Sequence, residues 1–148
     1  MQLLLDIENI SVSIGEKEIL SDVSLAVSSG EVHFLMGPNG SGKSSLAYAL
    51  AGHPEYRLTR GRAVLGGQDL TAMTPEARAS AGLFLSFQEP PEIGGVSMSV
   101  FLKTIAADHD FQAVAERTPP LLSALRLEES FLSRLVNEGF SGGEKKKS

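Results

Sequence analysis

The sequence predicts an α/β fold in its first half, followed by a helical second half, and three observations carry this expectation. Residues 2–14 and 19–27 alternate apolar and polar side chains, as half-buried strands do. A glycine-rich segment stands between a short apolar run and a helix-forming segment. Beyond the Pro/Gly-rich segment at residues 89–95, nearly every segment is predicted to be helical.

The first half alternates strands, turns and one helix. Turns are expected at residues 15–17 and 28–30, where glycine follows or precedes polar residues. Residues 32–36 form a short, nearly unbroken apolar run, which predicts a strand buried on both faces. Residues 43–51 predict a helix, and residues 62–70 predict a strand, a Gly-Gly turn and a further short strand.

A second helix and a second buried strand are expected before the helical half. Thr74 followed by Pro75 predicts a helix start, with threonine as the cap and proline at the first helical position. Gly82 is expected to end this helix, and residues 83–87 to form another buried strand. Residues 89–95 predict a Pro/Gly-rich loop.

The second half is expected to contain three successive helices. Pro119 and Pro120 fall within the middle one, which they are expected to break or restart. The three helices are predicted at residues 98–107, 111–126 and 128–135.

Composition narrows the class of protein. The 148 residues are 42% hydrophobic, which is enough for a packed core, and they carry a formal net charge of −5. An acidic balance argues against a nucleic-acid role, because phosphate backbones attract basic surfaces. With no cysteine, the chain offers no disulfide and no thiolate ligand for a metal or cluster. Apolar runs are too short for a membrane span, so a cytoplasmic protein is expected.

A phosphate-binding loop is the strongest chemical signal. The segment GPNGSGKS matches G-x-x-x-x-G-K-[ST], in which glycines let backbone N–H groups converge on phosphate oxygens. The lysine can reach the β- and γ-phosphates, and the last serine can ligate Mg²⁺. A chance glycine-rich turn is disfavoured because a strand-like run precedes the loop and a helix follows it. The expected nucleotide-binding residues are Gly37, Pro38, Asn39, Gly40, Ser41, Gly42, Lys43, Ser44 and Ser45.

A second glycine motif, Ser141-Gly142-Gly143-Glu144, lies near the end of the sequence. Serine followed three residues later by glutamate is a capping box, which needs no further function. Two glycines in a first helical turn are destabilising, by about 1 kcal/mol each relative to alanine. They make sense where bare backbone must approach an anion. From the residues alone, a simple cap and an anion site both stay open.

The order of these motifs resembles that of ATP-binding cassette (ABC) ATPases. The blocks HFLMGPNGSGKSSLAYALAG, FQEPPEIGGVS and EGFSGGEKKK are similar to those of the SufC group, the ATPases of the SUF iron–sulfur cluster assembly system. The resemblance covers the whole chain and implies a P-loop NTPase fold of the ABC type. It implies an ATP-binding core with an antiparallel β subdomain over residues 1–88, and a helical subdomain over residues 89–148.

The resemblance also implies roles for matching residues. Gln88 would be the catalytic Q-loop glutamine, near the attacking water, and would join Ser44 at Mg²⁺. Ser141, Gly142 and Gly143 match the ABC signature, which would contact the γ-phosphate of ATP held by a second copy of the protein. The implied cofactors are ATP and Mg²⁺. The implied partners are SufB- and SufD-like proteins, for which the loop at residues 89–95 is the expected docking segment.

Three departures from the family pattern stand out. Ile14 occupies the place of the aromatic residue that stacks on adenine in many ABC proteins, and Lys147 the place of a usual arginine. No apolar run followed by Asp-Glu occurs after Gly40, so Walker B, the D-loop and the switch histidine have no match. The expectation is an incomplete ABC domain, the N-terminal portion of a longer ATPase, which alone would hydrolyse ATP poorly or not at all.

Other functions share part of these motifs. A transporter's ATPase subunit has the same phosphate loop and signature, and the segment EPPEIGGVS favours the SufC group instead. A non-catalytic nucleotide-binding interaction module would fit the missing acidic residues. A small-molecule P-loop kinase is disfavoured by the segment FSGGEKK.

Overall fold

The computed structural model describes residues 3–107 and 111–145. The chain divides into two compact units, residues 1–85 and residues 86–148, and each is described by itself. No helix within the described ranges combines the length and the apolar character that crossing a membrane requires.

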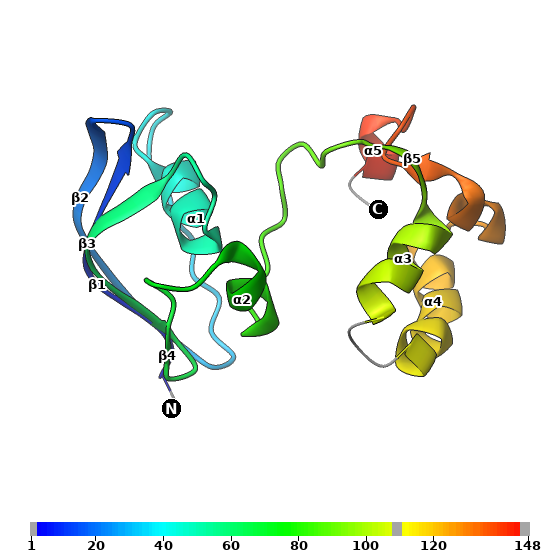
Figure 1. Cartoon of the computed structure of the whole chain (residues 1–148), viewed down its shortest axis with the longest axis horizontal. Coiled ribbons are helices and arrows are strands. Elements are labelled where there is room, and N and C mark those ends of the chain that lie inside the picture. The colour runs from blue at the N-terminus through cyan, green and yellow to red at the C-terminus, as the bar shows by residue number, and fades with distance from the viewer. Residues whose placement is uncertain (1–2, 108–110, 146–148) are drawn as a thin grey trace. The chain divides into compact units, whose positions relative to one another are not determined.

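The first unit contains a four-stranded antiparallel sheet, in the order β2-β1-β3-β4 (Figure 1). Gly15, with φ +56°, turns the chain between the two long strands, a conformation that glycine adopts without strain. The two expected N-terminal strands are confirmed, as is the strand–turn–strand near residues 62–70. The strands are β1 (Leu3–Ile14), β2 (Lys17–Ser28), β3 (Arg57–Leu65) and β4 (Gln68–Asp69).

One helix, α1 (Lys43–Ala51), packs against this sheet and forms the core. Its buried side chains are Leu46, Ala49 and Leu50, whose spacing puts them on one helical face. They meet Ile7 and Ile10 of β1, which are almost completely buried. The sheet therefore fixes the position of the helix that begins at the glycine-rich loop.

A short helix, α2 (Pro75–Ser80), follows the sheet as predicted. The hydroxyl of Thr74 accepts a hydrogen bond from the backbone N–H of Ala77 at 3.3 Å, which caps the helix. The helix ends at Ser80 with Ala81 as its C-cap, and Gly82 follows with φ +100°.

Both expected buried strands of the first half are corrected by the structure. Residues 32–36 and 83–87 belong to no strand in the described part of the chain. Val32, Phe34 and Phe84 are 77%, 83% and 87% exposed, so the expected burial is wrong as well. A strand needs a neighbouring backbone to accept its hydrogen bonds, and among the described residues neither segment finds one. The apolar residues of these segments predicted burial, but hydrophobicity does not identify the partner strand that a sheet requires.

The second unit is mainly helical, with a small two-stranded sheet of β5 and β6. Its core contains Met98, Leu122, Phe131, Val136 and Phe140. The elements are β5 (Ile93–Ser97), α3 (Met98–Ala107), α4 (Phe111–Leu125), the 3₁₀ helix η1 (Glu129–Ser133), β6 (Leu135–Val136) and α5 (Gly142–Lys145).

Three expectations for this unit are corrected. Part of the predicted loop at 89–95 forms β5, and the predicted helix at 128–135 shortens to η1 because Leu135–Val136 pairs with β5. Pro119 and Pro120 lie inside α4 without interrupting it. Each proline leaves the carbonyl four residues earlier without its helical donor. Those carbonyls belong to two exposed residues, so water can satisfy them.

Candidate nucleotide site

The glycine-rich segment folds into a loop that ends at the start of α1. Gly40 and Gly42 have φ values of +81° and +87°, the left-handed conformation that favours glycine. The backbone N–H of Ser41 donates to the carbonyl of Pro38 at 3.2 Å, so the loop closes on itself as a turn.

Lys43 reaches back over this loop. Its ammonium donates to the carbonyls of Gly37 and Pro38, both at 2.8 Å, and lies 3.4 Å from the hydroxyl of Ser41. These acceptors are neutral, so the lysine charge is not cancelled by a carboxylate. The loop therefore closes around a cation that has only neutral partners.

The N-terminus of α1 adds backbone donors at the same place. Gly42 is the N-cap and has no side chain to occupy the first N–H groups, and the first turn contains no acidic residue. The N–H groups of Lys43, Ser44 and Ser45 have no partner inside the helix, as in every first helical turn. Together with the helix dipole, they favour an anion in front of the loop.

Two glycines of the loop lie close to a neighbouring side chain. A Cβ atom on Gly42 would lie 2.3 Å from Cδ2 of Leu20, and one on Gly37 would lie 2.8 Å from the hydroxyl of Ser41. Beside the loop is a cavity of about 300 Å³, lined partly by Leu20, Met36 and Lys43. Residues 37–45 thus form one loop and the first turn of α1 beside this cavity.

The second glycine motif forms the expected capping box in the second unit. The Ser141 backbone N–H and hydroxyl donate to Oε2 of Glu144 at 2.9 and 2.8 Å, and the Glu144 N–H returns a bond to the hydroxyl at 3.3 Å. Arg134 donates to the other carboxylate oxygen, Oε1. The Ser141 N–H, then Arg134, then the Ser141 hydroxyl lower the pKa of Glu144 to about 2.

Arg134 is a residue that sequence reasoning missed. It lies ten residues before Glu144, a separation that matches no local motif. Its guanidinium also stacks on Phe140, with Cζ 4.2 Å from the ring centroid. An arginine just before a short strand gave no signal that could distinguish it from a solvent-exposed charge.

The remaining predicted residues are placed as follows. Gln88 lies in the second unit and is exposed, whereas Ser44 lies in the first turn of α1 in the first unit. Ile14 ends β1 and is 36% exposed. Lys147 lies outside the described residues.

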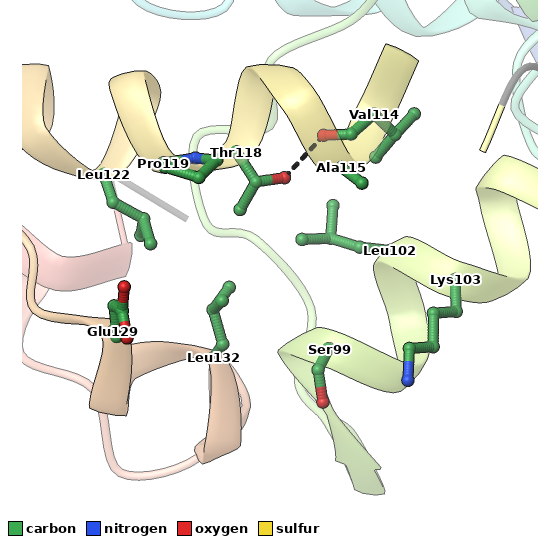
Figure 2. Close-up of a pocket in the computed structure, with 10 residues that line it drawn as sticks. All are labelled: Ser99, Leu102, Lys103, Val114, Ala115, Thr118, Pro119, Leu122, Glu129 and Leu132. Atoms are coloured by element: carbon green, nitrogen blue, oxygen red, sulfur yellow. Dashed lines mark hydrogen bonds between the residues drawn. The ribbon is translucent and has the colours of Figure 1, made fainter. Parts of the chain in front are cut away.

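A separate cavity of about 360 Å³ lies between α3, α4 and η1 (Figure 2). Figure 2 shows Leu102 of α3 pointing toward Val114 and Ala115 of α4. The Thr118 hydroxyl donates to the Val114 carbonyl at 2.7 Å, so it is already engaged within the helix. Within residues 3–107 and 111–145, no group of three or more acidic, histidine or cysteine side chains is placed to hold a metal ion.

Comparison with known proteins identifies the family. A profile of the ABC transporter family matches residues 20–148 of this chain. The chain belongs to the ABC transporter family. The probable ATP-dependent transporter ycf16 of Pyropia yezoensis is 46% identical over 99% of this chain and 62% of its own length. The probable ATP-dependent transporter SufC of Escherichia coli K12 is 45% identical over 97% of this chain and 62% of its own length.

Solved ABC structures agree with this membership. The ATP-binding subunit of an ABC transporter matches with a TM-score of 0.80 and 30% identity, over 97% of this chain and 58% of that one. The ABC fold and the similarity to SufC, both expected from the sequence, are confirmed. The chain spans about three fifths of the length of these relatives.

Proposed function

We propose that this chain forms the ATP-binding part of an ABC ATPase that serves iron–sulfur cluster assembly. The observation that carries ATP binding is the phosphate loop. Lys43 keeps its charge in front of the first turn of α1, whose N–H groups are open to an anion. ATP hydrolysis is proposed only for the whole protein, because this chain covers 62% of the length of the ycf16 and SufC relatives.

The proposed binding mode uses the backbone and one cation. Phosphate oxygens would accept from the N–H groups between Gly37 and Ser45, while Lys43 would contact the β- and γ-phosphates. The loop glycines allow this approach because a Cβ would block it or strain the backbone. The cavity beside Leu20 and Met36 offers apolar surface next to the phosphate position.

Mg²⁺ fits the donor set as an ion shared with the nucleotide. The ion usually keeps several waters and takes one or two protein oxygens together with substrate phosphates. Ser44 supplies one hydroxyl from the first turn of α1, and Gln88 is proposed as a further ligand and as the residue that orients water. When bound, Mg²⁺ would neutralise charge on the phosphates during transfer.

A second copy of the protein is proposed to complete the site. Ser141, Gly142 and Gly143 would contact the γ-phosphate of ATP bound by the other copy. The donors would be the backbone N–H groups of the two glycines, because the N–H and hydroxyl of Ser141 already donate to Glu144. All three are exposed, and within residues 3–107 and 111–145 a Cβ on either glycine would meet nothing within 4 Å. Internal packing therefore does not require these glycines, which supports a role in approaching another molecule.

SufB- and SufD-like proteins are the proposed partners. Support comes from the segment EPPEIGGVS and from the SufC name of a 45% identical relative. The alternative is a transporter's ATPase subunit, because the same relatives are described as probable ATP-dependent transporters. Reversing the charges of Glu89 and Glu92 should reduce pull-down of SufB and SufD by the whole protein. Unchanged capture of both would reject this docking segment.

The test of nucleotide binding compares Lys43→Ala with Lys17→Ala, which removes an exposed lysine from β2. Charge-assisted hydrogen bonds contribute about 1.5–3 kcal/mol each, so losing one to a phosphate should weaken MgATP binding roughly 10- to 150-fold. The Lys17 variant should bind as the parent does. Titration with a fluorescent ATP analogue, on samples with matched circular dichroism, measures both. Equal affinities of parent and Lys43→Ala would reject the assignment.

A further inference from the structure

We infer that Arg134 balances the charge of Glu144 and positions the signature, so that residues 141–143 can accept an anion. This inference rests on the proposed function, in which a γ-phosphate approaches these residues. Glu144 poses a problem for that function. It places a carboxylate within hydrogen-bond distance of Ser141, beside the backbone that would meet the phosphate. An uncompensated negative charge there would repel the ligand.

The two carboxylate oxygens of Glu144 accept hydrogen bonds from different residues. Oε2 accepts from the N–H and the hydroxyl of Ser141, which fixes the direction of that hydroxyl. Oε1 accepts from Nη1 of Arg134. The carboxylate of Glu144 therefore orients the Ser141 hydroxyl through Oε2 and pairs with the cation of Arg134 through Oε1.

Arg134 is itself held in place by two aromatic rings. Its Cζ atom lies 4.2 Å from the centroid of Phe140 and 5.9 Å from that of Phe131. The rings are buried and 5.1 Å apart, so they form a fixed surface under the guanidinium. Arginine suits this position better than lysine, because a planar group can stack on a ring and donate to a carboxylate at once.

The experiment uses two forms of the chain. One is labelled with ¹⁵N and carries Lys43→Ala, which empties its own loop, while its Gly142 and Gly143 amide signals report on the signature. The other is the unlabelled parent loaded with MgATP. Titrating the second into the first should shift both signals, and the midpoint concentration measures contact between the signature and bound ATP.

Four changes in the labelled chain separate charge balance from a merely structural role. Arg134→Gln should raise the midpoint about tenfold, as expected for one like charge near the phosphate. Arg134→Gln combined with Glu144→Gln should return it to within about twofold of the parent, since both charges of the pair are removed together. Arg134→Lys should lie between these values. The matched control, Arg117→Gln, removes an exposed arginine of α4 and should change nothing.

Each outcome decides between the two proposals. If the parent chain fails to bind MgATP, the proposed function fails by itself. If the parent binds MgATP but the Gly142 and Gly143 signals never shift, the inference about Arg134 is overturned. It is also overturned if Arg134→Gln matches the parent, or if the double variant stays as weak as Arg134→Gln. The last result would identify Arg134 as structural support alone.

Discussion

Replacing the buried Arg78 by leucine should destabilise the first unit more than any exposed arginine can. Arg78 lies on α2 and is only 6% exposed. Its Nη1 donates to the carbonyls of Ala49 and Leu50 at 2.7 and 2.8 Å, and its Nε donates to that of Met73 at 3.1 Å. It thus caps the end of α1 opposite the phosphate loop, where a cation also complements the helix dipole.

The magnitude follows from the acceptors left behind. Ala49 keeps a second donor, the N–H of Gly52 at 3.1 Å, whereas the carbonyls of Leu50 and Met73 lose theirs. A buried unsatisfied group costs about 1–3 kcal/mol, and the apolar leucine side chain offsets part of this. We expect a loss of about 2–4 kcal/mol in the free energy of unfolding. For a unit of this size, that lowers Tm by roughly 10–25 °C.

Thermal and urea unfolding, followed by circular dichroism, measure this change. The matched control is Arg62→Leu, which removes an exposed arginine that pairs with Asp69 at 2.9 Å on the sheet. Exposed ion pairs contribute about 0–1 kcal/mol, so the control should unfold nearly as the parent does. Equal losses for the two variants would refute the claim that burial and the three backbone bonds decide the effect.

Three further predictions concern the loop, the signature and the exposed apolar segments. Gly42→Ala should weaken both folding and MgATP binding, because its Cβ would collide with a leucine, whereas Gly40→Ala should cost only the left-handed strain of about 1–2 kcal/mol. The pKa of Glu144 is lowered to about 2 from its ordinary value of 4.5. The ionised carboxylate therefore stabilises the fold above pH 4.5, and this stabilisation is lost as the pH falls toward 2. Titration of the Glu144 carboxyl group by NMR should show the lowered pKa. Changing Phe34 and Phe84 to serine should reduce self-association, measured by light scattering, because both rings are exposed. The Tm should not fall, and a lower Tm would show that these rings are packed in solution.

Elements with local signals could be predicted from the sequence. The β1–β2 hairpin alternates apolar and polar residues around Gly15, and α2 starts with a threonine cap and proline. Each signal lies within the segment that it describes. The helix α1 could be predicted for the same reason, since the phosphate-loop motif includes its first residues.

Elements that depend on a distant partner could not be predicted. Residues 32–36 are apolar enough for a buried strand, but hydrophobicity says nothing about which backbone will accept their hydrogen bonds. The segment at 128–135 has a helical pattern, yet Leu135–Val136 joins β5 instead. Pro119 and Pro120 lie within α4 because the carbonyls that they leave open belong to exposed residues.

The residues of the candidate site likewise differ in whether a local motif predicts their contacts. The motif identified Lys43, but its bonds to the carbonyls of Gly37 and Pro38 appear only once the loop has folded. The capping box predicted the pairing of Ser141 with Glu144 because both lie within one turn. Arg134 approaches Glu144 through the packing of Phe131 and Phe140, which no short motif encodes.

The two glycine motifs differ in how they manage charge, and this difference predicts an order of events. In the phosphate loop, Lys43 is surrounded by neutral acceptors, so the site keeps a net positive charge. In the signature, the charge of Arg134 is paired with the carboxylate of Glu144, whereas the charge of Lys43 faces only neutral acceptors. Affinity for free nucleotide should therefore reside in the loop, because a cation without a carboxylate partner attracts an anion from solution better than a paired one does. The signature should engage only a phosphate that a loop already holds.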